Sequence, residues 1–192
     1  MINGSIPALV TPFSNGIIDH EALKGLVEWQ IQEGSHGIVA VGTTGESPTL
    51  SHEEHQEVIE IIVKQTKGRV PVIAGAGSNN TREAMDLMQF AKRVGADAVL
   101  VVAPYYNKPN QKGLYAHYKS ICENSDIPIV IYNIPGRSIV DLSYDSFKQL
   151  NKVSNIVGIK DASNDMSRPL VMRTFMKKDF NYLSGEDGTI AG

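Results

Sequence analysis

The chain has 192 residues, of which 42% are hydrophobic and 20% are charged, so its length and composition fit one globular domain better than two. Its formal net charge is −3, from 18 Lys and Arg against 21 Asp and Glu, without a long run of like charge. This charge pattern gives no reason to expect a nucleic-acid or membrane partner, whereas a small anionic ligand would need only a local cation.

Short runs rich in Val, Ile and Ala alternate with longer amphipathic segments, which is typical of parallel strands covered by helices. In chain order, the predicted strands are Ile6–Val10, Gly37–Val41, Val70–Ala74, Ala98–Val102, Pro128–Tyr132, Ile156–Lys160 and Asn181–Ser184. The predicted helices are Asp19–Glu33, Ser51–Thr66, Thr81–Val94, Gly113–Asn124, Tyr144–Leu150 and Met166–Met176. Ser51 followed by Glu54 predicts a capping box at the start of the second helix.

The number of repeats indicates the fold class. Seven successive βα units exceed the five or six that are usual in a doubly wound sheet, so the sequence predicts an α/β protein with a (β/α)₈ barrel. We expect a single catalytic domain over residues 1–192. A barrel of this kind typically needs about 250 residues, so we expect seven of the eight strands, with the C-terminal portion missing and two strand edges unpaired.

Polar residues follow the predicted strands at their C-terminal ends. The segments are GTTGES, GAGSNN, APYYNKP, YNIPGRS and KDAS. Both barrels and doubly wound sheets bind their ligands at this end of the strands, so these turns are the predicted site whichever fold is present.

Lys160 ends the apolar stretch Ile156–Ile159, so its amine is predicted to project from a strand end into the mouth of the barrel. Burial there disfavours the ammonium form and gives the free amine that attacks a ketone carbonyl. Tyr132 ends the preceding strand, where its phenol would shuttle protons beside the lysine. The alternatives are an ion pair of Lys160 with Asp161 and a tyrosine that only fills the core.

Two further segments offer groups that bind carboxylates. Thr43 and Thr44 lie in a turn flanked by glycines, whose amides and hydroxyls would hold a carboxylate. Arg137 would bind a second carboxylate through paired hydrogen bonds. The alternatives are an ordinary turn and a solvated surface arginine.

Other chemistries are not supported by the sequence. The GAGSNN segment lacks the third glycine of a dinucleotide-binding loop, and His52 and His55 do not match the HExxH zinc pattern, so no metal site is predicted. Cys122 is the only cysteine, and the N-terminal segment lacks a signal-peptide pattern. We therefore expect a cytoplasmic protein.

Four ordered motifs together resemble the dihydrodipicolinate synthase family of pyruvate aldolases. They are GTTGESPTL at Gly42–Leu50, APYYNKP at Ala103–Pro109, YNIPGR at Tyr132–Arg137 and GIKDAS at Gly158–Ser163. The likeness extends from IPALVTPF near the N-terminus to LSGED near the C-terminus.

The resemblance implies that Lys160 forms a Schiff base with pyruvate, so that no external cofactor is needed. It implies that Tyr132, Thr43 and a Tyr106 lent by a neighbouring subunit form a proton relay. Thr44 and Gly185 would line the pyruvate pocket, and Arg137 would bind the second substrate. The implied reaction condenses pyruvate with L-aspartate-4-semialdehyde to 4-hydroxy-tetrahydrodipicolinate, on the route to diaminopimelate and lysine, in a homo-oligomer built as a dimer of dimers.

The resemblance also implies feedback control by lysine. The residues that would bind this effector are Ser47, His52, His55, Asn79, Glu83 and Tyr105. The alternative for this set is a polar rim of a dimer. For the activity, two alternatives are a sister aldolase, such as an N-acetylneuraminate lyase or a ketodeoxygluconate aldolase, and an incomplete barrel without turnover.

Overall fold

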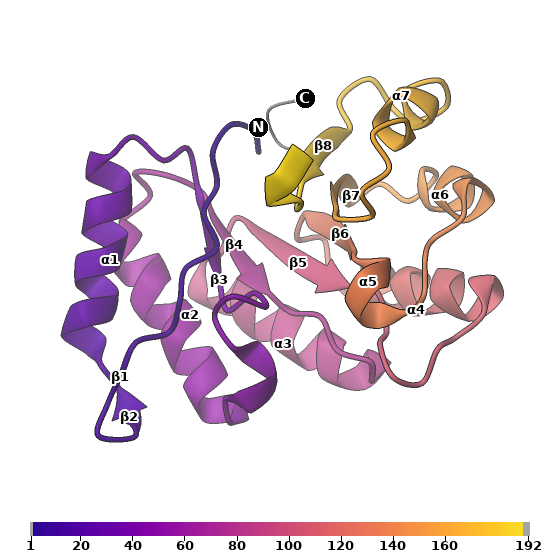
Figure 1. Ribbon diagram of the computed structural model, residues 1–192. Helices are drawn as coiled ribbons and strands as arrows, with labels where there is room; N and C mark the ends of the chain where they lie inside the picture. Colours follow the sequence, from indigo (N-terminus) through magenta and orange to yellow (C-terminus); the bar gives the residue numbers. More distant parts are fainter. Residues whose placement is uncertain (1, 190–192) are drawn as a thin grey trace. The chain divides into compact units, whose positions relative to one another are not determined.

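A computed structural model describes residues 2–189 of the chain (Figure 1). Its residues form two compact units. The first comprises Met1–Gly75 and Leu87–Leu100, and the second comprises Ala76–Asp86 and Val101–Gly192. Helix α3 (Thr81–Val94) and strand β5 (Ala98–Val102) each contribute residues to both units.

The first unit contains parallel strands covered by helices. Its elements are β1 (Phe13–Ser14), β2 (Ile17–Ile18), α1 (His20–Gln32), β3 (Ile38–Ala40), the 3₁₀ turn η1 (Ser47–Thr49), α2 (His52–Thr66) and β4 (Val72–Gly75). β3 pairs with β4, and β4 pairs with the start of β5, all in parallel. Helices α1 and α2 lie side by side in Figure 1, and α2 also contacts β3 and β4.

Helices α1 and α2 each begin at a residue whose side chain caps the helix. Asp19 caps α1 by accepting a hydrogen bond from the amide of Ala22. The predicted capping box of α2 is confirmed, because Ser51 and Glu54 each accept a hydrogen bond from the other's backbone amide. The buried faces of the helices carry aliphatic residues at helical spacing, namely Leu23 and Val27 on α1 and Val58, Ile59 and Ile62 on α2.

The predicted strand Ile6–Val10 is wrong in its extent. Ala8 forms a single parallel bridge, to Val39. Two backbone hydrogen bonds make this bridge: the Leu9 amide donates to the Val39 carbonyl, and the Val39 amide donates to the Pro7 carbonyl. Pro7 has no N–H to extend the ladder, so the segment runs beside β3 without becoming a regular strand. The hairpin of β1 and β2 follows it and was not predicted.

The second unit repeats the same plan. Its elements are α4 (Gln111–Glu123), β6 (Ile129–Asn133), α5 (Pro135–Ser138), α6 (Tyr144–Leu150), β7 (Ile156–Asp161), α7 (Arg168–Met172), β8 (Asn181–Ser184) and the 3₁₀ turn η2 (Asp187–Thr189). The three strands pair in parallel in the order β6, β7, β8. Helices α4 and α6 contact each other, and β6 and β8 flank β7 (Figure 1).

Helix α7 is shorter than the predicted helix Met166–Met176. Pro169 occupies its first turn, the part of a helix where a proline is tolerated, so the helix does not reach back to Met166. After Met172 the hydroxyl and the amide of Thr174 both donate to the carbonyl of Val171, and the chain continues in tight turns. The last part of the predicted helix is therefore irregular.

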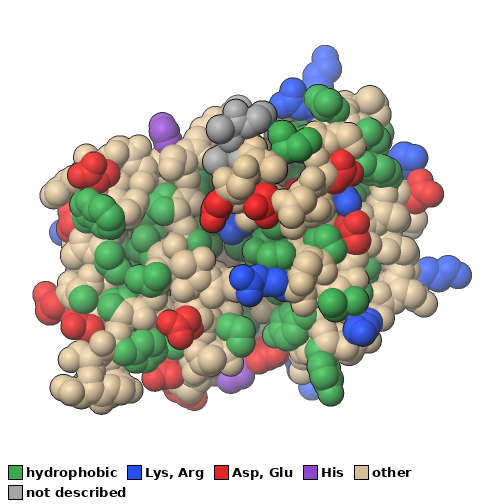
Figure 2. Space-filling view, viewed as in Figure 1, with side chains coloured by type: hydrophobic (Ala, Val, Ile, Leu, Met, Phe, Trp, Pro, Cys, Tyr) green, Lys and Arg blue, Asp and Glu red, His purple; other side chains and the backbone are tan. Residues whose placement is uncertain are grey.

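The order of elements confirms the α/β class, because parallel strands follow one another along the chain with helices between them. Among residues 2–189, no helix has both the length and the apolar sequence that a membrane span requires. The face drawn in Figure 2 exposes both acidic and basic side chains.

Candidate active site

Lys160 and Tyr132 face each other across two neighbouring strands of the second unit. The register pairs Tyr132 of β6 with Lys160 of β7 and Lys160 with Leu183 of β8. Side chains of paired residues project from the same face of a sheet. The Lys160 Nζ atom lies 4.6 Å from the centroid of the Tyr132 ring, which is buried. The structure therefore brings together the two residues that the sequence places at adjacent strand ends.

The environment of Lys160 favours its neutral amine. Burial lowers the pKa of Lys160 below its ordinary value, and the carboxylate of Asp187 in η2 partly opposes this shift. A lowered pKa raises the fraction of free amine at neutral pH, which is the form that attacks a carbonyl group.

The carboxylate of Asp161 is bound away from Lys160. Consecutive residues of a strand project from opposite faces, so Asp161 and Lys160 diverge. The carboxylate accepts hydrogen bonds from Ser163 at 2.6 Å and from Asn133 at 3.0 Å, and it lies 3.7 Å from the guanidinium of Arg168. These contacts disfavour the alternative in which Lys160 is simply the ion-pair partner of its neighbour.

Gly185 leaves the space that the Lys160 side chain occupies. It directly follows β8, and its amide donates to the carbonyl of Asp161 at 2.7 Å. A Cβ atom built on Gly185 would lie 2.8 Å from the Cε of Lys160 and 3.2 Å from the Cβ of Ala162. A methyl group there would displace the lysine, so this glycine belongs to the same constellation.

The threonine turn lies in the first unit, directly after β3. Thr43 and Thr44 are exposed, and the turn closes with a 3.0 Å bond from the amide of Gly45 to the carbonyl of Gly42. The preceding residue, Val41, is buried and has a φ of 51°, which is a rare conformation for a β-branched residue. Such local strain occurs most often at functional sites.

The end of β4 approaches the strained Val41 closely. A Cβ atom on Gly75 would collide with the carbonyl oxygen of Val41, so only glycine fits at the end of β4. The buried His55 of α2 is 2.8 Å from the carbonyl of Gly75 through its Nε2 atom. The backbone of Gly75 thus lies against the residue that precedes the threonine turn and also contacts a buried histidine of α2.

Two predicted residues have exposed side chains in the second unit. Tyr106 is 87% exposed and has a φ of 67°, in the segment that follows β5. Arg137 lies on α5, directly after the strand that carries Tyr132, and its side chain is exposed. Their roles in a partner's site and in substrate binding stay predictions.

The six residues of the predicted lysine site divide between the two units. Ser47, His52 and His55 belong to the first unit, and Asn79, Glu83 and Tyr105 belong to the second. Some of them have contacts already: His55 meets the Gly75 carbonyl, Glu83 accepts from the Ser78 hydroxyl, and the Asn79 carbonyl accepts from Asn107. Lysine binding at these residues stays a prediction.

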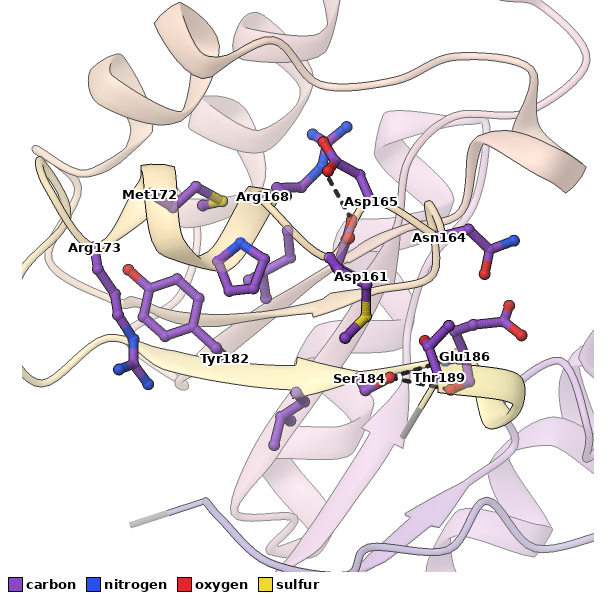
Figure 3. A pocket seen from close by; sticks show the side chains of 14 residues that line it. Asp161, Asn164, Asp165, Arg168, Met172, Arg173, Tyr182, Ser184, Glu186 and Thr189 are labelled. Carbon is purple, nitrogen blue, oxygen red and sulfur yellow. Dashed lines mark hydrogen bonds and ion pairs between the residues drawn. The ribbon is translucent and has the colours of Figure 1, made fainter. Parts of the chain in front are cut away.

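A pocket of about 260 Å³ lies beside β7, α7 and β8 (Figure 3). Asp161 and Arg168 line it, and Figure 3 shows them close to each other on one side. With Asn133 and Asp141 they form a polar cluster that the sequence analysis missed. The sequence did hold one signal for two members of this cluster. Asn133 and Asp161 directly follow Tyr132 and Lys160, so strands that pair the second two residues also pair the first two.

Comparison with known proteins identifies the family. The model of the dihydrodipicolinate synthetase family matches residues 1–192. The 4-hydroxy-tetrahydrodipicolinate synthase of Rhodospirillum centenum is 62% identical over 98% of this chain and 65% of its own length. That of Ruegeria pomeroyi is 61% identical over 100% of this chain and 66% of its own. The chain therefore spans somewhat less than two thirds of the length of these curated relatives.

Solved structures agree with this result. The chloride-inhibited dihydrodipicolinate synthase from Acinetobacter baumannii, complexed with pyruvate, superposes with a TM-score of 0.95. The two are 50% identical, and the match covers 98% of this chain and 65% of that structure. This likeness confirms the predicted (β/α)₈ class for the part of the fold that the chain comprises. The chain belongs to the dihydrodipicolinate synthetase family.

Proposed function

We propose that this chain carries the imine-forming lysine of a lyase that condenses pyruvate with L-aspartate-4-semialdehyde to give 4-hydroxy-tetrahydrodipicolinate. One observation carries the proposal: the partly buried amine of Lys160 lies over the ring of Tyr132 at the end of β7, in a chain of this family. The proposal concerns the whole enzyme, of which the chain matches somewhat less than two thirds.

The first step is imine formation. The neutral amine of Lys160 attacks the ketone carbon of pyruvate, and the carbonyl oxygen takes a proton to give a carbinolamine. Loss of this hydroxyl as water leaves a C=N bond to Lys160. Both halves of the step need a proton at the departing oxygen, and the hydroxyl of Tyr132 is the group that we assign to its transfer. Thr43 is the proposed relay partner.

The second step forms the new carbon–carbon bond. The protonated imine withdraws electrons from the adjacent methyl group, so that loss of a methyl proton gives an enamine. The enamine carbon attacks the aldehyde carbon of the second substrate, whose oxygen takes up a proton. The amino group of that substrate then attacks the imine carbon and closes the ring, and the Lys160 amine leaves. Because the imine is the electron sink, the proposal assigns no metal ion or organic cofactor to this reaction.

The remaining site residues are assigned to the two substrates. The exposed hydroxyls of Thr43 and Thr44 and the amides of their turn suit the carboxylate of pyruvate. The exposed guanidinium of Arg137 suits the carboxylate of the second substrate, since its planar fork makes paired hydrogen bonds. Gly185 belongs to the wall of the pyruvate pocket.

The proposal includes assembly into a dimer of dimers in the cytoplasm, where both substrates are metabolites. Tyr106 supports an interface, because its side chain is 87% exposed and aromatic residues are enriched at protein contact surfaces. We propose that its hydroxyl enters the site of a neighbouring copy and completes the proton relay there.

Covalent trapping tests the proposal. Borohydride in the presence of pyruvate is expected to reduce the imine and leave one carboxyethyl group on Lys160, found by mass spectrometry on the peptide that contains Gly158–Ser163. Lys160→Ala is expected to abolish the label. Labelling of another lysine in a folded sample would contradict the assignment.

The second substrate is tested by turnover. Product formation with L-aspartate-4-semialdehyde, compared with sugar-derived aldehydes, separates the proposed synthase from a sister aldolase. Trapping without turnover would show that the chain makes the imine and does not complete the condensation.

A further inference from the structure

A second pair of facing residues lies one position beyond Tyr132 and Lys160. The register pairs Asn133 of β6 with Asp161 of β7. Because side chains alternate along a strand, this pair projects from the opposite face of the two strands. The Tyr132–Lys160 pair and the Asn133–Asp161 pair are therefore consecutive residue pairs of β6 and β7, and their side chains lie on opposite faces of the two strands.

The amide of Asn133 connects two carboxylates. This side chain is completely buried, and its Nδ2 atom donates to Asp141 at 2.8 Å and to Asp161 at 3.0 Å. Its Oδ1 atom accepts from the backbone amide of Leu142 at 3.2 Å. Asn133 thus ties the end of β6 to the end of β7 and to the segment between α5 and α6.

Arg168 neutralises the same carboxylates. It is 7% exposed, and its Nη2 atom is 2.7 Å from a carboxylate oxygen of Asp141. Its Nη1 atom donates to the carbonyl of Leu142 at 3.1 Å, and its Nε atom lies 3.7 Å from Asp161. Asn133 and Arg168 are buried, Asp161 is half-buried and Asp141 is exposed, so the four side chains form one polar network that runs from the interior to the surface. The buried charge of Arg168 is paired within this network, as buried charges generally are.

The pairing of β6 with β7 is irregular at the start of the two strands, so their register has to be held elsewhere. Ile129 pairs with Ile156, but Val130 pairs with Gly158, so the register shifts by one residue at the start of the strands. A one-residue slip moves every side chain to the other face of a strand. Such a slip in β7 would turn Lys160 away from Tyr132.

We propose that Asn133, Asp161 and Arg168 are positioning residues that hold the ends of β6 and β7 in the register that places the Lys160 amine over the Tyr132 ring. Backbone bonds from Ala162 to the Asn133 carbonyl and from Gly185 to the Asp161 carbonyl continue this ladder. The expected effect of this network on catalysis rests on the function proposed above. Its expected effect on the position of the Lys160 amine does not.

The network also keeps a negative charge away from the amine. Within residues 2–189, the Tyr132 ring of β6 lies against the Lys160 amine, the Asp187 carboxylate of η2 raises the pKa of that amine, and its chain neighbour Asp161 is turned to the other face. Loosening the strand ends would hydrate the amine and free the Asp161 carboxylate. Both changes favour the ammonium form of Lys160.

The test compares two asparagines of similar bonding. Asn133→Ala removes the link at the C-terminal ends of the strands. Asn155→Ala is the matched control, because Asn155 directly precedes β7 and its Nδ2 atom donates to two backbone carbonyls, those of Cys122 and Ser125. Both changes lose two partly buried hydrogen bonds of a side-chain Nδ2 atom, but only Asn133 lies at the end that carries Lys160.

The first readout is the rate of borohydride trapping with pyruvate, divided by the folded fraction measured by circular dichroism. We expect Asn133→Ala to lose about 10²-fold, the scale of a misplaced reacting group, and Asn155→Ala to stay within about twofold of the parent chain. Asp161→Ala is expected to lose as much as Asn133→Ala. Asp161→Asn keeps the acceptor for Asn133 and is expected to recover most of the rate.

The second readout needs no pyruvate. Labelling with acetic anhydride over a range of pH, read for Lys160 by mass spectrometry, reports the basicity of its amine. The half-labelling pH is expected to move upward in Asn133→Ala and to stay unchanged in Asn155→Ala. If Asn133→Ala does not fold, Arg168→Lys is read in the same way, since a lysine keeps the charge and loses the paired bonds.

The outcomes separate the two proposals. If acetic anhydride labels Lys160 of the parent chain but borohydride never traps pyruvate there, the proposed function is refuted. The positioning role can still be judged in that case from the pH dependence of anhydride labelling. Equal effects of Asn133→Ala and Asn155→Ala in both readouts, or no recovery in Asp161→Asn, would overturn the positioning role.

Discussion

Gly185 and Lys160 fit together so closely that the backbone of one sets the path of the other's side chain. A Cβ atom on Gly185 would lie 2.8 Å from the Cε and 3.1 Å from the Cγ of Lys160. Real Cβ atoms do not approach carbon atoms this closely, so Gly185→Ala has to push the lysine aside. We expect the rate of pyruvate trapping to fall at least about tenfold, with little change in stability.

Gly136→Ala is the control for this prediction. Gly136 lies on α5, and a Cβ atom built there meets no atom within 4 Å. Trapping is therefore expected to be unchanged. If Gly185→Ala traps pyruvate as fast as Gly136→Ala does, the close fit has no bearing on the chemistry.

Tyr132→Phe tests the hydroxyl separately from the ring. The ring stays beneath the Lys160 amine, so packing is kept, and only the proposed proton-transfer group is removed. Trapping is expected to slow about 10²–10⁴-fold. Tyr118→Phe removes a buried hydroxyl of α4 that donates to the Val101 carbonyl at 3.2 Å and has no assigned part in this chemistry. It is expected to cost about 1 kcal/mol of stability without slowing the trapping of folded molecules.

A second pair of glycines tests the close approach of Gly75 to Val41. A methyl group at Gly75 would collide with the Val41 carbonyl, so Gly75→Ala is expected to destabilise the fold by about 1–3 kcal/mol, the usual cost of overpacking. Gly25 lies in the interior of α1 with open space around it. Gly25→Ala is expected to stabilise by about 1 kcal/mol. Urea unfolding midpoints of the two variants that move in the same direction would contradict this reading.

The pairing of Lys160 with Tyr132 could be predicted because it depends only on parallel strands that follow one another along the chain. Each residue closes an apolar run, and adjacent parallel strands bring such ends together. The capping box of α2 is similarly local, since Ser51 and Glu54 are three residues apart. Short-range sequence patterns were thus sufficient to predict the helices and strands and the residues at the centre of the candidate site.

The polar network behind the site could not be predicted in this way. Asn133 finds Asp141 eight residues away and Asp161 twenty-eight residues away, and nothing in the sequence pairs them. The β1–β2 hairpin was missed for another reason. Its strands have two residues each, too short for a periodic pattern, although the turn residues Asn15 and Gly16, with φ of 51° and 81°, are a common hairpin signal.

The last prediction concerns the pH dependence of stability and the buried His117 of α4. This residue is 5% exposed, and its Nδ1 atom is 2.9 Å from the hydroxyl of Thr81. Among the described residues its Nε2 atom has no hydrogen-bond partner. Burial lowers the pKa of His117 from 6.5 to about 4 in the folded chain.

The sign follows from proton binding. Between pH 6.5 and 4 the unfolded chain binds a proton at His117 and the folded chain does not, so the stability present above pH 6.5 is lost as the pH falls through this window. Between pH 7 and pH 5 the loss amounts to about 2 kcal/mol, at 1.36 kcal/mol for each pH unit below 6.5.

His117→Phe removes the titrating group and keeps a ring of similar size. Its unfolding free energy is therefore expected to fall by about 2 kcal/mol less than that of the parent chain over the same range. Tyr118→Phe is the control and is expected to keep the parent's pH dependence, because burial raises the pKa of the Tyr118 hydroxyl far above this range. If His117→Phe loses as much stability between pH 7 and pH 5 as the parent does, His117 is not held neutral by burial.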